Sequence, residues 1–164
     1  HYSSYPEIGL GLVNILSETA GSQKLIGGQM EDILGEDQQL SGDELNFIHL
    51  NKTSALIEGS LKMGATIGKA SRDQIEQIAD YGRCIGLGFQ IMDDILDATS
   101  NSETMGKEVG ADEAANKSTY VSIHGLQYSR FKLDELTEKA YQICADLNAP
   151  FLRNFARYLN ERTF

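Results

Sequence analysis

Residues 90–97, Gln-Ile-Met-Asp-Asp-Ile-Leu-Asp, place three carboxylates and one amide within about two turns of a predicted helix. The polar members of this stretch follow the spacing i, i+3, i+4 and i+7: Gln90, Asp93, Asp94 and Asp97. Side chains with this spacing lie on one face of a helix. Like charges so placed repel by a few tenths of a kcal/mol per pair, roughly, unless a cation offsets them.

An acidic face on a helix has two interpretations, a solvated surface or a cation site. A solvated face normally mixes both signs of charge, but no Lys or Arg occurs from Gly86 to Asp97. The preceding residues 84–89 are small or apolar, which indicates a buried segment that leads into the carboxylates. These two features favour a cation site. Aspartate oxygens without nearby Cys or His favour Mg²⁺ over Zn²⁺, and the spacing does not fit a calcium EF-hand loop.

The composition indicates a globular protein rather than a nucleic-acid-binding or membrane-spanning one. The chain has 164 residues, enough for one domain with its own core, and a formal charge of −10. Nucleic-acid binding requires a basic surface, which this charge argues against. No apolar run reaches the ~18–20 residues of a membrane span, and no secretory signal is present. Because Cys84 and Cys144 lack CxxC spacing, we expect buried free thiols and a cytoplasmic location.

The apolar residues recur with helical periodicity throughout, so the predicted class is all-α, with residues 1–164 as a single helical domain. Predicted helices cover residues 8–16, 22–34, 43–68, 71–97, 126–147 and 150–159. Residues 98–116 form a long irregular stretch, and residues 118–124 are helical or extended. Gly35 is a predicted helix stop, Ser41 or Asp43 a predicted N-cap, and Ser71 opens a capping box.

Three further polar clusters accompany the acidic face. Gln29 and Asp32 are spaced i, i+3 on one predicted helix, and His49, Lys52 and Thr53 are spaced i, i+3, i+4 on the next; Lys107 and Lys117 follow the acidic helix. Each has an ordinary explanation: a cap or a helix–helix hydrogen bond for the first pair, a structural histidine, and solvated lysines. Taken together, lysines beside a carboxylate helix suit an anion that also binds through metal, and a diphosphate is the simplest such ligand.

The order of these clusters resembles the trans-polyprenyl diphosphate synthases, in particular the short-chain farnesyl/geranylgeranyl type. The resemblance runs from about Gly9 to Arg162 through four motifs: Gly28-Gln29…Asp32; His49-x-x-Lys52-Thr53; Gly86-x-x-Phe89-Gln90-x-x-Asp93-Asp94-x-x-Asp97; and Gly106-Lys107…Gly110-x-Asp112…Lys117-Ser118-Thr119. A DDxxD sequence alone is weak evidence for this family, but four motifs in this order and spacing are strong evidence. The resemblance implies an isoprenoid-synthase-type helical bundle.

The family has two aspartate-rich motifs, and the one at Asp93–Asp97 resembles the second. No other DDxxD occurs in the 164 residues, and the arginines expected beside the first motif are absent. We therefore expect this chain to be the C-terminal portion of a synthase, with the first motif upstream or on another chain. The fragment alone is expected to have little or no turnover.

The resemblance implies a prenyltransferase that condenses isopentenyl diphosphate with an allylic diphosphate through Mg²⁺-assisted ionisation. It assigns roles that residue chemistry alone does not: Asp93, Asp94 and Asp97 as metal ligands, and Lys52, Lys107 and Lys117 as diphosphate contacts. The implied catalytic residues are Thr53 and Gln90, whose oxygens would face the developing carbocation, and Lys52, which would contact the leaving diphosphate. Gln29 and Asp32 are implied to support the site or the fold, and His49 to be structural. A homodimer is also implied.

Two alternatives remain at this point. A terpene cyclase also uses aspartate-rich helices, but Asn101-Ser102-Glu103 is contiguous rather than spread over helical turns, and the Lys52-Thr53 pair favours a synthase. A non-catalytic subunit or truncated relative that acts only as a binding partner would explain the missing first motif. The retained lysines and aspartates argue against it. Product length is set near the first motif, so this sequence does not determine it.

Overall fold

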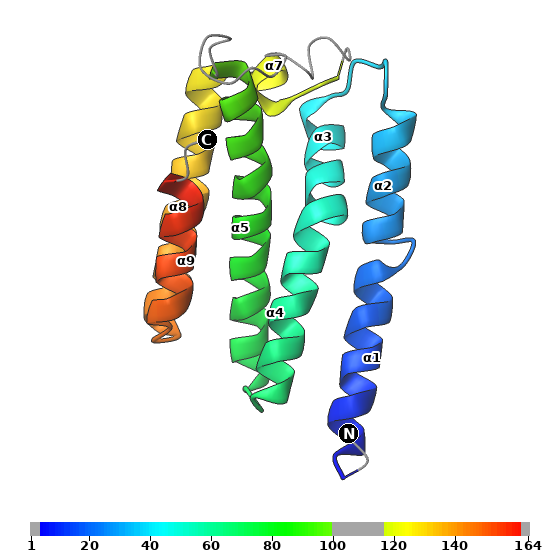
Figure 1. Ribbon diagram of the computed structural model, residues 1–164, viewed down its shortest axis with the longest axis vertical. Helices are drawn as coiled ribbons and strands as arrows, with labels where there is room; N and C mark the ends of the chain where they lie inside the picture. Colours follow the sequence, from blue (N-terminus) through cyan, green and yellow to red (C-terminus); the bar gives the residue numbers. More distant parts are fainter. Residues whose placement is uncertain (1–3, 100–116, 162–164) are drawn as a thin grey trace, which may run out of the picture.

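The computed structural model describes residues 4–99 and 117–161, and every regular element in these ranges is a helix (Figure 1). The elements in chain order are α1 (Pro6–Ala20), α2 (Leu25–Leu34), α3 (Gly42–Ile48), η1 (His49–Ser54), α4 (Ala55–Ile67), α5 (Arg72–Thr99), α7 (Tyr120–His124), α8 (Leu126–Asp146) and α9 (Pro150–Glu161). The predicted all-α class is confirmed. The expected irregular stretch 98–116 lies outside the described residues except for Ala98 and Thr99, which are helical.

The helices form an up-and-down arrangement with α5 at its centre. α1 and α2 form one outer column, and α3, η1 and α4 form an adjacent column that runs back beside α5 (Figure 1). α8 packs on the other side of α5, and α9 packs on both α8 and α5. The predicted acidic helix therefore has neighbours on both sides, which explains why residues 84–88 in its middle are small or apolar and buried.

Local signals mark three helix ends where the sequence predicted them, whereas α1 extends beyond the predicted 8–16 at both ends and α2 begins three residues after the predicted start at 22. Ser41 is the N-cap of α3, and its hydroxyl and the Glu44 carboxylate form a reciprocal capping box. Ser71 and Gln74 form the same arrangement before α5. Gly35 is the C-cap of α2, as expected.

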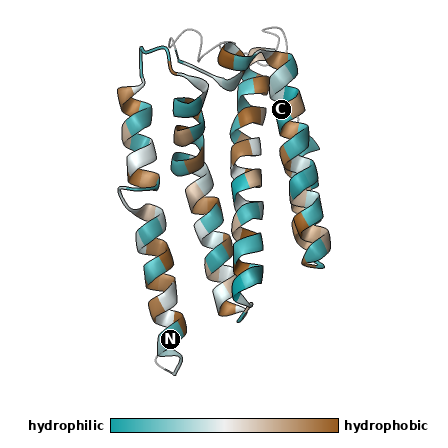
Figure 2. Ribbon diagram, turned by 180° about the vertical axis from the view of Figure 1, so that it is seen from behind, coloured by the Kyte–Doolittle hydropathy of each residue, from teal (hydrophilic) through white to brown (hydrophobic). Residues whose placement is uncertain are grey.

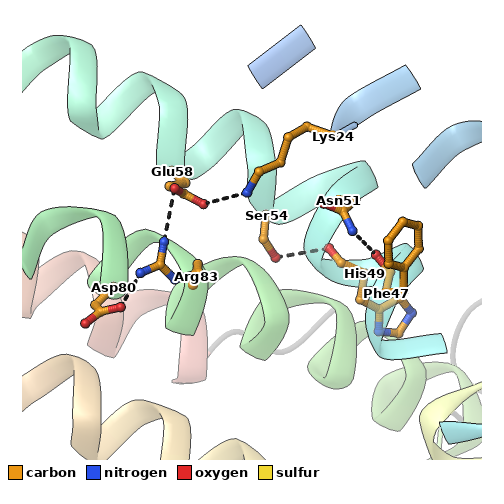
Figure 3. A network of polar contacts seen from close by, with 8 residues as sticks. All are labelled: Lys24, Phe47, His49, Asn51, Ser54, Glu58, Asp80 and Arg83. Atoms are coloured by element: carbon orange, nitrogen blue, oxygen red, sulfur yellow. Dashed lines mark hydrogen bonds and ion pairs between the residues drawn. The ribbon is translucent and has the colours of Figure 1, made fainter. Parts of the chain in front are cut away.

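The predicted helix over residues 43–68 is continuous in the structure, but its helical type changes in the middle. Its centre is the π-helical segment η1, in which the Ser54 hydroxyl donates to the His49 carbonyl oxygen at 3.0 Å (Figure 3). A π-helical turn inserts extra backbone into a helix and occurs frequently at functional sites. Apolar periodicity spans such a turn without interruption, so the sequence pattern does not reveal it.

Ion pairs around the buried Glu58 join α4 to α5 and to the residue before α2. Arg83 on α5 donates to Glu58 Oε1 at 3.0 Å, and Lys24, immediately before α2, donates to Glu58 Oε2 at 3.4 Å (Figure 3). Arg83 also pairs with Asp80 on its own helix. Because Glu58 is buried, its two cationic partners offset the cost of removing its charge from water.

The outer α1–α2 column carries an exposed apolar stripe (Figure 2). Its large exposed side chains are Leu10, Val13, Leu16, Ile26, Met30, Ile33 and Leu34. Exposed apolar surface of this extent is typical of a contact with another polypeptide. Within residues 4–99 and 117–161, no helix has both the length and the apolar character needed to cross a membrane.

Candidate diphosphate and metal site

A cavity of about 220 Å³ lies where α2, α3, η1, α5 and residues 117–119 meet. The polar residues that line it come from all of the predicted clusters: Asp32, His49, Lys52, Gln90, Asp93, Asp94, Lys117, Ser118 and Thr119. Gly35, Leu40, Leu45 and Ile48 complete its wall. Segments that are far apart in the sequence thus converge on one polar cavity.

One wall of the cavity belongs to α5. Gln90, Asp93 and Asp94 line it from one face of the helix, as their spacing predicted. The backbone N–H of Tyr120 donates to Asp94 Oδ2 at 2.6 Å, which ties this carboxylate to the start of α7. The bond is charge-assisted, and such bonds are roughly twice as strong as those between neutral groups.

The opposite wall carries two lysines that share one carboxylate. Lys52 Nζ lies 2.5 Å from Asp32 Oδ2, and Lys117 Nζ lies 3.3 Å from Asp32 Oδ1. Asp32 is only 9% exposed. Burial by itself would raise its pKa, but the hydrogen bond from Lys52 and the charges of both lysines outweigh burial, so the pKa lies below its ordinary value of 3.8. With two ammonium groups on one carboxylate, this wall retains a net positive charge.

Close helix contacts hold the lysine wall in place. A Cβ at Gly28 of α2 would lie 2.7 Å from the carbonyl carbon of Asn51 and would also meet the backbone nitrogen of Lys52. A Cβ at Gly86 of α5 would lie 2.5 Å from both Cα and Cβ of Ser54. Both glycines therefore allow neighbouring helices to reach the backbone of η1, and η1 is fixed between them.

His49 lies in the wall between the two polar sides. Its side chain is 7% exposed, and burial lowers its pKa to about 4, against the opposing effect of the Asp32 charge. The imidazole is therefore neutral at pH 7. Its ring stacks near Tyr120, with centroids 6.5 Å apart. The structural role predicted for His49 stays a prediction, although this histidine also faces the cavity.

The structure brings together most, but not all, of the predicted site residues. Lys52, Gln90, Asp93, Asp94 and Lys117 line the cavity. Thr53, on η1, and Asp97, one turn beyond Asp93, are half-buried and are not among its lining residues. Lys107 lies outside the described residues. Residue roles at this site remain predictions.

The carboxylates that line the cavity are the donors available to a Mg²⁺ ion. Among the described residues, no three His, Cys, Asp or Glu side chains are grouped so as to hold a metal ion by themselves. Mg²⁺, however, is commonly bound through one or two carboxylates, with substrate phosphate oxygens and waters completing its octahedron. Asp93 and Asp94 supply such a pair, so the residues present fit Mg²⁺ that is shared with a phosphate ligand rather than held in a protein cage.

The sequence did not predict that Asp32 organises the lysines or that Ser118 joins the site to the α2–α3 connection. Ser118 accepts a hydrogen bond from the Leu40 N–H at 3.1 Å and donates one to the Gln38 carbonyl oxygen at 3.1 Å. A signal for Asp32 was present: it lies one helical turn after Gly28, on the face of α2 that is buried against η1. No local signal identifies the Ser118 contacts, which join residues about 80 positions apart.

Comparison with known proteins places the chain in a family. The profile of the family described as Polyprenyl synthetase matches residues 3–149. The chain is 45% identical over 133 residues to a farnesyl diphosphate synthase of Micrococcus luteus, covering 80% of this chain and 46% of that one. It is 44% identical over 131 residues to the large subunit 1 of a heterodimeric geranylgeranyl pyrophosphate synthase of Arabidopsis thaliana, covering 78% and 35%.

Solved structures agree with this assignment. A geranyltransferase from Helicobacter pylori, crystallised with magnesium and isoprenyl diphosphate, superposes with a TM-score of 0.75 at 29% identity, over 93% of this chain and 51% of that one. The chain spans less than half the length of the curated relatives it matches. The isoprenoid-synthase-type helical fold is confirmed, as a part of the longer fold of these relatives. By sequence and by structure, this chain belongs to the polyprenyl synthetase family.

Proposed function

We propose that this chain forms the allylic diphosphate side of a trans-prenyltransferase, which condenses isopentenyl diphosphate with an allylic diphosphate to give a short-chain prenyl diphosphate. The observation that carries the proposal is the pairing of opposite charges across one cavity. Asp93 and Asp94 line one side, and Lys52 and Lys117 line the other. A diphosphate that bridges to a divalent cation matches this pattern, since its oxygens satisfy the lysines and its metal satisfies the aspartates.

The reaction requires that the allylic C–O bond break, with its electron pair leaving on the diphosphate. The double bond of isopentenyl diphosphate then forms the new C–C bond to the allylic carbon, and loss of a proton restores a double bond. Mg²⁺ bound by Asp93 and Asp94 would supply Lewis-acid stabilisation of the leaving diphosphate. Lys52 and Lys117 donate hydrogen bonds to its oxygens and hold it in place as charge develops.

The remaining predicted residues have supporting parts in this proposal. The Gln90 side chain lines the cavity one turn before Asp93 and can present its carbonyl oxygen to a carbocation without acting as a strong nucleophile. Thr53, on η1, is proposed to direct an oxygen toward the carbocation in the same way. Asp97 is proposed to complete the metal site, and Lys107 to add a further diphosphate contact, when substrate is bound.

Two relatives support the assignment of Mg²⁺ and substrate class. The Micrococcus luteus relative is a farnesyl diphosphate synthase, and the Helicobacter pylori structure contains magnesium and isoprenyl diphosphate. Because this chain spans only part of such proteins, we propose that the activity belongs to the longer assembly, and that residues 1–164 alone have little turnover. We propose that residues beyond this cavity set the chain length of the prenyl diphosphate product.

The exposed apolar stripe on α1 and α2 supports the expected homodimer, with a second copy of the protein against this face. One of the relatives is a subunit of a heterodimer, so the mass of the assembly in solution is the quantity that tests the homodimer. Light scattering after gel filtration should give twice the mass of one full-length chain at micromolar concentration. A mass equal to one chain would contradict the homodimer.

The function is tested in the full-length protein by product formation from dimethylallyl and isopentenyl diphosphates with Mg²⁺. Asp93→Asn and Lys117→Gln should each lower kcat by about 100-fold or more, because each removes a group that stabilises the leaving charge. Lys139→Gln is the matched control, since Lys139 is exposed on α8. A second measurement is the melting temperature with Mg²⁺ and inorganic diphosphate. Wild-type protein with neither turnover nor a melting shift would contradict a synthase and indicate the non-catalytic subunit.

A further inference from the structure

Tyr120 makes contacts on both sides of the cavity without lining it. Its side chain is only 2% exposed, which places it among the most buried in the described residues. Its backbone N–H donates to Asp94 Oδ2, and its ring lies next to that of His49, with an interplanar angle of 21°. Asp94 belongs to the carboxylate wall, and His49 belongs to the same π-helical segment as Lys52.

The ring of Tyr120 is the anchor for this part of the chain. It packs in the apolar cluster with Leu45 of α3 and with Ile91 and Ile95 of α5. On its other side it contacts the ring of His124, with centroids 4.7 Å apart. Because α5 contributes to this cluster, the position of the Tyr120 backbone relative to Asp94 is set by ring packing.

The residues just before Tyr120 connect the same backbone to the lysine wall. Lys117 pairs with Asp32 of α2, and Ser118 hydrogen-bonds to the α2–α3 connection. Thr119 caps α7, accepting from the Ser122 N–H at 3.1 Å. Four consecutive residues therefore contact every polar side of the cavity, and Tyr120 is the one with a buried side chain.

We infer that Tyr120 is a positioning residue for Asp94, and that its packed ring holds the backbone N–H that orients this carboxylate toward a divalent cation. The inference rests on the proposed function, in which Asp94 is a metal ligand. A carboxylate oriented by a fixed donor has fewer rotamers to lose when a cation binds, and groups that orient a ligand in this way typically affect metal affinity by about 10–100-fold.

The test uses the full-length protein and measures Mg²⁺ binding by titration calorimetry in the presence of inorganic diphosphate. Tyr120→Leu should weaken Mg²⁺ binding by about tenfold. Tyr120→Phe keeps the ring and the backbone N–H and should bind Mg²⁺ with wild-type affinity. Tyr128→Leu is the matched control, because Tyr128 belongs to the same group of rings but lies on its exposed side. Thr119→Ala, which frays the start of α7 without touching the buried ring, should weaken Mg²⁺ binding in the same direction.

A second titration separates positioning from general loosening of the cavity. Inorganic diphosphate without Mg²⁺ depends on the lysine wall. Asp32 and the Ser118 hydrogen bonds hold this wall without the Tyr120 ring, so diphosphate affinity should be unchanged in Tyr120→Leu. Equal loss of both affinities would overturn the inference, as would Mg²⁺ binding by Tyr120→Leu that equals wild type. Wild-type protein that binds no Mg²⁺ with diphosphate would instead contradict the proposed function, so the two failures are distinguishable.

Discussion

Gly86→Ala is expected to destabilise the protein even though alanine is the better helix former. Gly86 lies inside α5, where replacing Gly by Ala normally stabilises a helix by about 1 kcal/mol. Here the added methyl group would lie 2.5 Å from both Cα and Cβ of Ser54, well inside van der Waals contact. Because the Cα and Cβ of Ser54 do not move when its side chain rotates, no change of rotamer relieves the clash.

The magnitude follows from two opposing effects. Overpacking a tight contact costs about 1–3 kcal/mol, and a contact with atoms that side-chain rotation cannot move belongs at the upper end of that range. Subtracting about 1 kcal/mol for the helix-propensity gain leaves a net destabilisation of about 2 kcal/mol. For a domain of this size, each kcal/mol corresponds to roughly 2–4 °C in melting temperature, so the expected decrease is about 4–8 °C.

Gly64→Ala is the matched control. Gly64 also lies in a helix, α4, but a Cβ at this position would meet no heavy atom within 4 Å. This variant should gain up to about 1 kcal/mol, the propensity gain alone. Urea unfolding followed by circular dichroism measures both variants against wild type. If Gly86→Ala were as stable as Gly64→Ala, the close approach of α5 to η1 would be refuted.

Three other changes test the ion pairs and the core. Asp32 has a lowered pKa in the folded state, so at a pH below about 3.8 the unfolded chain binds more protons and wild-type stability should fall. Asp32→Asn should lack this part of the acid dependence, measured by melting from pH 7 to 2.5. Glu58→Gln removes the charge that Arg83 and Lys24 share and should cost about 1–2 kcal/mol of stability in urea unfolding. Glu76→Gln, in an exposed pair, should cost less than about 0.5 kcal/mol. Equal costs would contradict a supporting role for the Glu58 ion pairs. Tyr81→Phe removes the 2.8 Å hydrogen bond to the Leu152 carbonyl oxygen that joins α5 to α9 and should lower stability by about 1 kcal/mol, and an unchanged urea midpoint would argue against that bond.

Local patterns in the sequence were enough to predict which residues share a helix face and where several helices begin. Gln90, Asp93 and Asp94 line one cavity because spacing within a helix is set by its 3.6-residue turn, a local property. The caps at Ser41 and Ser71 are local too, since each uses a partner three residues away. Signals of this kind depend on neighbours in the sequence and can be predicted without knowledge of the fold.

How those helix faces meet depends on the packing of the helices and could not be predicted from local patterns. Lys52 and Lys117 were expected at a diphosphate, but the carboxylate they share is Asp32 of α2. Lys52 lies on η1, 20 residues away, and Lys117 lies just before α7. The link from Tyr120 to Asp94 spans 26 residues. Such contacts depend on the distance between helix backbones, which is set by the packing of η1 against the glycines of α2 and α5, and no helical period encodes that distance.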